Sequence, residues 1–185
     1  MSQIGVIGAG AWGTALAKHL AQKGHSVQFW AYEREVVDAI NATHENSRFL
    51  PGVTLPQTLR ATNSLAQATE GCESIVFAVP SHVARAVLQQ LAPVLSDGAA
   101  IISATKGVEE DTLKLITQVM EDVLPQSCHQ SLMVLSGPSF ATEVSRGQPT
   151  ALCLAGKNST IVTRFQSVLK SSTFPAMRSL RSSLS

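Results

Sequence analysis

The chain has 185 residues, with 14 Lys and Arg against 13 Asp and Glu, so its formal net charge is +1. It is 44% hydrophobic, 15% charged and 5% aromatic, which supports a folded core and excludes a disordered chain. The near-neutral charge and the scarcity of aromatic rings argue against a broad nucleic-acid surface. The length suits one domain, or one domain and the start of another.

The cysteines Cys72, Cys128 and Cys153 are far apart and belong to no C-x-x-C or Cys/His cluster. We therefore expect no metal site and no disulfide framework, but reduced, buried thiols in a cytoplasmic protein. We also expect no signal peptide before the first motif and no membrane insertion, because no charged stretch followed by an apolar one precedes Gly8 and no apolar run is long enough to span a bilayer.

The first predicted elements are a strand over Gln3–Ile7 and a helix that opens with the G-x-G-x-x-G of Gly8–Gly13. Gly8 permits a tight turn, Gly10 lets a pyrophosphate approach the backbone, and Gly13 lets the helix pack closely on the strand. Lys23 and Gly24 end that helix, and a second strand over Ser26–Ala31 completes a βαβ unit. This context predicts a dinucleotide site; the alternative is a glycine-rich turn between packed elements.

Strands and helices then alternate to the end of the chain. A helix with Val36, Val37 and Ile40 precedes a loop over Asn46–Pro56. The further strands are expected at Thr58–Thr62, Ser74–Val79, Ala99–Ser103, Leu132–Leu135 and Ala151–Ala155. Short helices are expected over Ser64–Glu70 and Phe140–Arg146, and a last helix is expected from an N-cap at Ser159. Two further helices are indicated by their apolar faces: one by Val83, Val87, Leu88 and Leu91, and one by Leu113, Ile116, Met120, Val123 and Leu124. This order predicts an α/β fold with a Rossmann-like, doubly wound, mostly parallel sheet.

Ligands of such sheets bind beyond the carboxyl ends of the strands. That rule selects the stretches Gly8–Gly13, Ala31–Arg34, Pro80–His82, Thr105–Gly107 and Gly137–Ala141.

The tip of the second strand bears on the choice of nucleotide. An acid there binds the ribose 2′-OH of NAD, whereas a nearby Arg accepts the 2′-phosphate of NADP. Glu33 lies 25 residues after Gly8, late for the usual acid, and Arg34 is adjacent. We therefore expect NADP to be preferred over NAD; the alternative is that Glu33 and Arg34 form a solvated helix start.

Other polar residues after strands have two readings each. Ser81 is expected to cap the next helix, and His82 is either a surface residue or a general base. Lys106 is either surface decoration or a point charge for a phosphate or a polarised oxygen. Gly137 and Ser139 form either a structural turn or a close-approach site with Ser139 as a cap at an anion-binding helix end. Hydrolase and kinase motifs are absent from the sequence.

Several motifs occur together and in order. They are G-A-G-A-W-G-T-A-L-A from Gly8, N-S-R-F-L-P from Asn46, A-V-P-S from Ala78, T-K-G from Thr105 and S-G-P-S-F-A from Ser136. Over about Gln3 to Phe174 the chain resembles the nucleotide-binding domain of bacterial NAD(P)-dependent glycerol-3-phosphate dehydrogenase.

The resemblance implies an oxidoreductase that reduces dihydroxyacetone phosphate to sn-glycerol 3-phosphate for phospholipid synthesis. It implies that the cofactor is lined by Ala11, Trp12, Tyr32, Lys106 and Ala141, and that the small-molecule substrate is held by Lys106, Gly137 and Ser139. Members of the family often have Ser where this chain has Ala11. The alanine can still offer its backbone N–H to the cofactor, but it lacks the hydroxyl of the serine.

The end of the sequence departs from the family pattern. We expect an NAD(P)-binding domain over residues 1–174 and a divergent, Ser/Arg-rich tail over 175–185, without the family's helical substrate domain and its catalytic lysine. This predicts cofactor binding with little dehydrogenase activity. A non-catalytic nucleotide-binding remnant and a dehydrogenase of another 2-hydroxy or 2-keto acid stay open as alternatives, as does a homodimer.

Overall fold

The computed structural model describes residues 1–174 and 177–181. Its strands are β1 Gln3–Ile7, β2 Ser26–Trp30, β3 Arg60–Thr62, β4 Ser74–Phe77, β5 Ala100–Ser103, β6 Leu132–Ser136, β7 Leu152–Gly156 and β8 Met177–Arg181. Its α-helices are α1 Ala11–Gln22, α2 Arg34–Thr43, α3 Leu65–Thr69, α4 Ser81–Leu91, α5 Ile116–Val123, α6 Ala141–Ser145 and α7 Ser159–Leu169, and 3₁₀ turns cover Ala92–Val94 and Gln126–Ser131.

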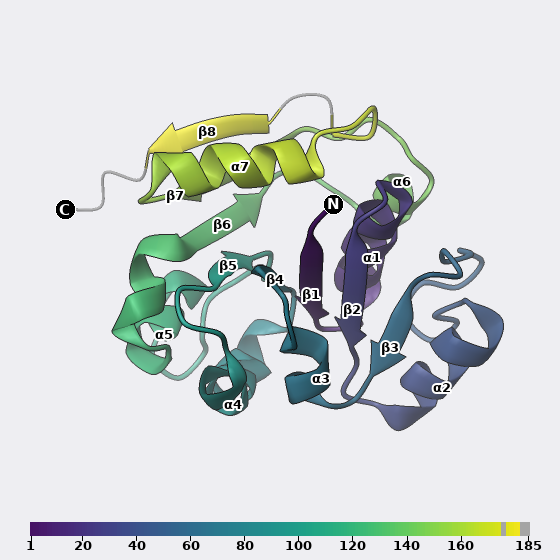
Figure 1. Cartoon of the computed structure of the whole chain (residues 1–185), viewed down its shortest axis with the longest axis horizontal. Coiled ribbons are helices and arrows are strands. Elements are labelled where there is room, and N and C mark those ends of the chain that lie inside the picture. Colours follow the sequence, from purple (N-terminus) through teal and green to yellow (C-terminus); the bar gives the residue numbers. More distant parts are fainter. Residues whose placement is uncertain (175–176, 182–185) are drawn as a thin grey trace.

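The described strands form one sheet in the order β3-β2-β1-β4-β5-β6-β7-β8 (Figure 1). Pairing is parallel from β3 through β6, antiparallel between β6 and β7, and parallel again between β7 and β8. The predicted doubly wound, mostly parallel sheet is therefore confirmed. The strand order reverses beside β1, which places a topological switch point between β1 and β4, where ligands of such sheets bind.

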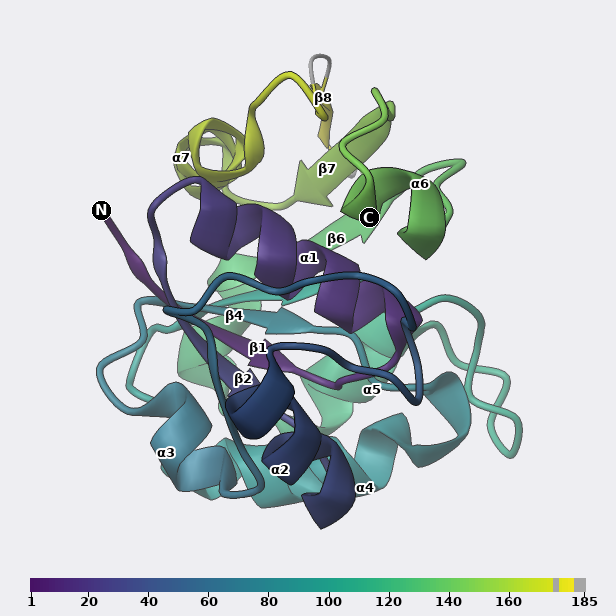
Figure 2. The same ribbon diagram turned by 90° about the vertical axis from the view of Figure 1, so that its right-hand side faces the viewer.

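Helices cover both faces of the sheet because each βα unit contributes one apolar stripe. One core cluster joins α1, through Leu16 and Leu20, to α7, through Phe165 and Leu169. The other joins α3, α4 and α5 to the opposite face, through residues such as Leu88 and Met120. Figure 2 shows α1 on one side of the sheet, with α3 and α4 on the other.

The end of α1 is tied to the end of α7. The buried His19 donates its Nε2–H to the carbonyl of Leu169 at 2.8 Å, and its ring lies 4.4 Å from that of Phe174, between centroids. Lys23 Nζ donates to the carbonyls of Ser167 and Lys170, so its charge caps the carboxyl end of α7.

Two predicted helix starts are wrong. Leu113 does not lie on α5: its φ is +56°, its N–H donates to the carbonyl of Glu109, and a bridge between Val108 and Leu115 makes this segment a small hairpin. The N-cap of α7 is Asn158, whose side chain accepts from the N–H groups of Thr160 and Ile161, and Ser159 is the first helical residue.

The remaining predictions concern thiols and the tail. Cys72 and Cys128 are buried as predicted, whereas Cys153 is half-buried. Part of the predicted tail forms β8, while residues 175–176 and 182–185 lie outside the described residues. Within the described ranges, no helix has the length and apolar character needed to cross a membrane.

Candidate functional site

The carboxyl ends of five parallel strands meet at one edge of the sheet. The stretches predicted to carry ligands follow β1, β2, β4, β5 and β6, which are neighbours in parallel pairing. The fold therefore gathers all of these stretches on one edge, from segments far apart in the sequence.

The glycine turn between β1 and α1 has the geometry expected of a phosphate-binding loop. Gly8 has φ +112°, and a Cβ there would lie 2.6 Å from the carbonyl oxygen of Ala78. A Cβ on Gly13 would lie 1.9 Å from the carbonyl oxygen of Gly8, so only glycine lets α1 approach this closely. A Cβ on Gly10 would meet no atom within 4 Å, so the space before the turn is open to a phosphate.

The first turn of α1 faces that open space. Gly10 is the N-cap and provides no side-chain cap. The first N–H groups of a helix have no intrahelical partner and carry a partial positive charge. Ala11 and Trp12, the first two residues of the helix, are half-buried beside it. These residues fit the pyrophosphate of a dinucleotide.

Lys106, after β5, points to the same place. Its Nζ lies 5.6 Å from the centroid of the Trp12 indole and donates to the carbonyl of Ser139 at 3.1 Å. The structure therefore brings together Trp12, Lys106 and Ser139 from three strand ends. An ammonium held between an indole ring and a carbonyl is a suitable point charge for an anionic ligand.

A network of charged groups holds the segment that follows Lys106. Arg85 on α4 donates two hydrogen bonds to the carboxylate of the buried Glu109, at 2.7 and 2.8 Å, and one to Asp122 at 3.0 Å. The hydrogen bonds from Arg85, and then Thr112, lower the pKa of Glu109 to about 2. Hydrogen bonds from Lys114, and then Arg85, lower the pKa of Asp122. The hairpin is thereby fixed against α4.

The turn after β6 differs from its prediction in one respect. A Cβ on Gly137 would lie 2.6 Å from the carbonyl oxygen of Ala151, so the close approach requires glycine. Ser139 is buried but is not a cap: its Oγ donates to the carbonyl of Gly137 at 3.4 Å, and the N-cap of α6 is Phe140. Ala141 is the first residue of α6 and is half-buried.

The predicted cap at Ser81 is also wrong. Pro80 is the N-cap of α4 and has no side-chain acceptor, while Ser81 is the first helical residue. Its Oγ would lie 3.3 Å from a Cβ on Gly107, so Ser81 packs against the T-K-G turn. His82 is exposed on the first turn of α4. Its imidazole has no hydrogen bond or ion pair with residues 1–174.

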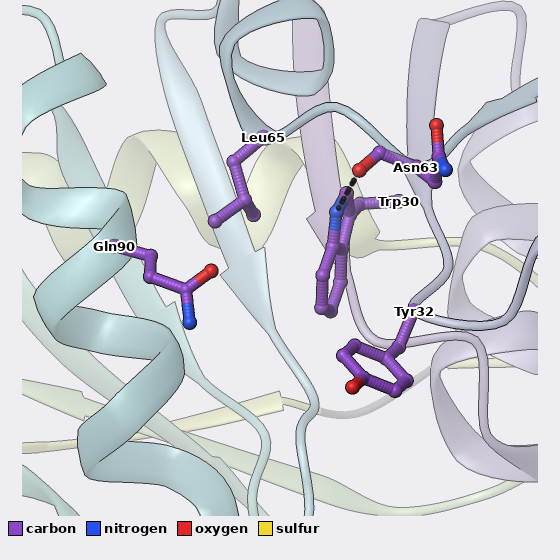
Figure 3. Close-up of a pocket in the computed structure, with 5 residues that line it drawn as sticks. All are labelled: Trp30, Tyr32, Asn63, Leu65 and Gln90. Atoms are coloured by element: carbon purple, nitrogen blue, oxygen red, sulfur yellow. Dashed lines mark hydrogen bonds between the residues drawn. The ribbon is translucent and has the colours of Figure 1, made fainter.

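The tip of β2 borders a hollow of about 600 Å³. Trp30, Tyr32, Asn63, Leu65 and Gln90 line it, and Figure 3 shows the two aromatic rings on one side and Gln90 on the helix across from them. Trp30 Nε1 donates to the carbonyl of Asn63 at 3.1 Å, and the Tyr32 side chain is left exposed. An aromatic-lined hollow at this position suits a flat, partly polar ring.

The acid and the base beside Tyr32 have different surroundings. Glu33 is the N-cap of α2, and its carboxylate lies 3.9 Å from Arg48 Nη2. Arg48 also pairs with Glu35 at 2.5 Å. Arg34 is exposed, and its guanidinium has no hydrogen bond or ion pair in the described part of the chain. The proximity of Arg48 was not predicted, because nothing local links a loop residue to a helix start before it.

Comparison with known proteins agrees with this geometry. The family model of the NAD-dependent glycerol-3-phosphate dehydrogenase N-terminus matches residues 3–162. A glycerol-3-phosphate dehydrogenase [NAD(P)+] of Geobacter sp. (strain M21) is 45% identical over 176 residues, which are 95% of this chain and 52% of that protein. One of Anaeromyxobacter sp. (strain K) is 47% identical over 91% of this chain and 51% of its own length.

A solved structure gives the same result. The crystal structure of glycerol-3-phosphate dehydrogenase from Coxiella burnetii superposes with a TM-score of 0.87 at 35% identity, covering 98% of this chain and 54% of that one. The chain spans about half the length of the relatives that it matches. The family model covers most of the sequence, and the glycine turn and the T-K-G and S-G-P-S-F stretches lie at one edge of the sheet. The chain therefore belongs to the NAD-dependent glycerol-3-phosphate dehydrogenase N-terminus family.

Proposed function

We propose that residues 1–174 form an NAD(P)-binding domain that supplies the cofactor half of a glycerol-3-phosphate dehydrogenase. The observation that carries this proposal is the open glycine turn at the start of α1, with the Lys106 ammonium over Trp12 beside it. The names and the family of the relatives support it.

The predicted residues divide between two ligands. The proposed cofactor residues are Gly8, Gly10, Ala11, Trp12, Gly13, Tyr32, Glu33, Arg34, Lys106 and Ala141. The proposed substrate residues are Lys106, Gly137 and Ser139. The shared position of Lys106, between Trp12 and the Ser139 carbonyl, supports a role at the boundary between cofactor and substrate.

The proposed reaction of the whole protein is the reduction of dihydroxyacetone phosphate to sn-glycerol 3-phosphate. The bound nicotinamide supplies the hydride. The Lys106 ammonium attracts the substrate's phosphate or polarises its carbonyl oxygen, and Gly137 lets the substrate approach the backbone. The free thiols of Cys72, Cys128 and Cys153 support a cytoplasmic location.

We propose NADP as the preferred cofactor. The support is the exposed guanidinium of Arg34, together with that of Arg48, which lies 3.9 Å from the carboxylate of Glu33. Dissociation constants for NADPH and NADH, measured by nucleotide fluorescence, test the preference. Arg34→Ala is expected to weaken NADPH binding about tenfold and to leave NADH binding unchanged, since one charge-assisted pair contributes about 1–2 kcal/mol. Tighter binding of NADH by the unaltered chain would refute the preference.

The function itself is tested by ligand-induced thermal stabilisation of the 185-residue polypeptide. NADPH at about 100 times its dissociation constant should add about 2.7 kcal/mol of stability, or about 5–11 °C for a domain of this size. With NADPH present, dihydroxyacetone phosphate should add a further shift and ketopantoate should not. Lys106→Met should abolish that further shift, whereas Lys157→Met, which removes a lysine paired with Glu121 at 2.7 Å, should retain it.

Turnover by the same polypeptide is expected to be low. In the described part of the chain, no carboxylic acid or imidazole is hydrogen-bonded to Lys106 or Ser139. A positioned general acid contributes about 10²–10⁴-fold to such a reaction. Oxidation of NADPH with dihydroxyacetone phosphate at a rate on the order of 1–10³ per second, as in an ordinary dehydrogenase, would show that these residues suffice.

A further inference from the structure

The loop that begins at Asn46 is bonded directly to the glycine turn. Asn46 is 1% exposed, and its Nδ2 donates to the carbonyl of Ala9 at 2.8 Å and to the hydroxyl of Thr14 at 2.8 Å. Its Oδ1 accepts from the N–H of Phe49 at 3.2 Å. Both donors and the acceptor of this buried amide are therefore used: one bond reaches the turn at Ala9 and one reaches α1 at Thr14.

Thr14 links Asn46 to the peptide between Gly10 and Ala11. Its side chain is fully buried, and its Oγ1 donates to the carbonyl of Gly10 at 2.8 Å while it accepts from Asn46. The carbonyl of Ala9 thus accepts from Asn46 Nδ2 and, at 3.3 Å, from Thr14 Oγ1. The carbonyl of Gly10 accepts from the Thr14 hydroxyl and also from the Thr14 N–H at 2.9 Å, so the hydroxyl is its second donor.

Holding a carbonyl also orients the N–H group of the same peptide. A trans peptide is planar, and its C=O and N–H point in opposite directions. Fixing the carbonyls of Ala9 and Gly10 inward therefore aims the N–H groups of Gly10 and Ala11 outward, away from Asn46. Neither N–H has an acceptor among the described residues. A donor to each carbonyl also polarises the peptide and strengthens its N–H as a donor.

We propose that Asn46 is a positioning residue for the nucleotide pyrophosphate: with Thr14 as relay, it orients the Gly10 and Ala11 N–H groups toward the phosphate. This inference rests on the proposed nucleotide function. A purely structural Asn46, which only attaches the loop to the domain, would affect stability and leave the affinity of the folded protein unchanged.

The test uses substitutions that separate the relay from loop attachment. Thr14→Val keeps the shape of the side chain and the bonds from Asn46 to Ala9 and Phe49, but removes the hydroxyl that donates to the Gly10 carbonyl and accepts from Asn46. Thr14→Ser retains the hydroxyl. Asn41→Asp is the matched control, because Asn41 clamps backbone in the same way, accepting from the N–H of Ala61 and donating to its carbonyl, both at 2.9 Å, but away from the turn.

NADPH dissociation constants are measured by fluorescence titration at a temperature where circular dichroism shows each variant folded. Thr14→Val should bind NADPH about tenfold or more weakly, because displacing a positioned group by about 1 Å costs up to about 10²-fold. Thr14→Ser and Asn41→Asp should bind within about twofold of the unaltered chain, since each retains the relay to the Gly10 carbonyl. In the nucleotide-free protein, the amide NMR resonances of Gly10 and Ala11 should shift in Thr14→Val and remain in place in Asn41→Asp.

Asn46→Asp is a second, independent variant. It retains the acceptor for the Phe49 N–H but loses both donors, so it should weaken NADPH binding at least as much as Thr14→Val. Equal NADPH affinity in folded Thr14→Val and the unaltered chain, with unshifted amides, would overturn the positioning role. Absence of NADPH binding by the unaltered chain would instead overturn the proposed function, and the amide shifts would still report on the relay.

Discussion

Replacing Gly13 by alanine tests whether close helix–strand contact builds the nucleotide site. The new Cβ would lie 1.9 Å from the carbonyl oxygen of Gly8 and 3.3 Å from the Cβ of Ala78. Carbon atoms essentially never approach a backbone oxygen closer than 3.0 Å, so α1 or the turn must shift by at least 3.0 − 1.9 = 1.1 Å. Both contacting groups directly follow central strands of the sheet, Gly8 after β1 and Ala78 after β4.

The expected cost follows from the size of that shift. Overpacking by one methyl in a close-packed interior typically costs about 1–3 kcal/mol, and a backbone contact places this substitution at the upper end. At about 3 kcal/mol the midpoint of thermal unfolding should fall by about 6–12 °C for a domain of this size. NADPH affinity should fall as well, because the turn that presents its N–H groups moves by about 1 Å.

Gly10→Ala is the matched control, since the same methyl at that position meets no atom within 4 Å. It should change the free energy of unfolding by no more than about 1 kcal/mol, yet weaken NADPH binding by filling the space for the pyrophosphate. Urea unfolding followed by circular dichroism and fluorescence titration with NADPH measure the two quantities. A Gly13→Ala protein as stable as the unaltered chain, or a Gly10→Ala protein with unchanged NADPH affinity, would refute the reasoning.

Two further predictions concern α7 and its contact with α1. Asn158→Ala should cost about 1 kcal/mol of stability through the lost cap and Ser159→Ala much less, measured by urea unfolding; equal losses would contradict the assignment of Asn158 as the cap. Burial lowers the pKa of His19 below its usual 6.5, and burial likewise lowers that of His25. The unfolded chain therefore binds more protons at mildly acid pH, so the free energy of unfolding should decrease as pH falls below about 6.5. His19→Gln, which keeps a donor for the Leu169 carbonyl, should reduce that decrease; an unchanged pH slope would exclude His19 as its source.

The sequence predicted the features that depend on local pattern. Alternating apolar strands and helical faces were enough for the parallel sheet, and the glycine spacing after β1 was enough for the turn. The helix caps were harder to predict, because Asn158 and Ser159 are both good cap residues and the backbone decides between them. The predicted start of α5 was wrong because the apolar spacing includes Leu113. The conformation of Leu113 is set by a hairpin, and Arg85 on α4 holds that hairpin in place.

The candidate site was predictable by position and less so by contact. The carboxyl-end rule selected stretches that the fold gathers at one edge of the sheet, that of Lys106 among them. It could not indicate that Lys106 lies over Trp12, or that Arg48 reaches Glu33, because these pairs form only when distant segments pack. Asn46 belongs to the N-S-R-F-L-P motif, but its bonds to Ala9 and Thr14 depend on a long loop folding back onto α1.

The tie between α1 and α7 has a consequence for synthesis on the ribosome. The glycine turn is synthesised long before α7, but the far end of its helix is completed by carbonyls of Ser167, Leu169 and Lys170 and by the ring of Phe174. Contacts of such long sequence separation form late in folding, because the chain entropy of loop closure must first be overcome. In the nascent chain, the carboxyl end of α1 therefore lacks these partners until α7 and Phe174 have emerged.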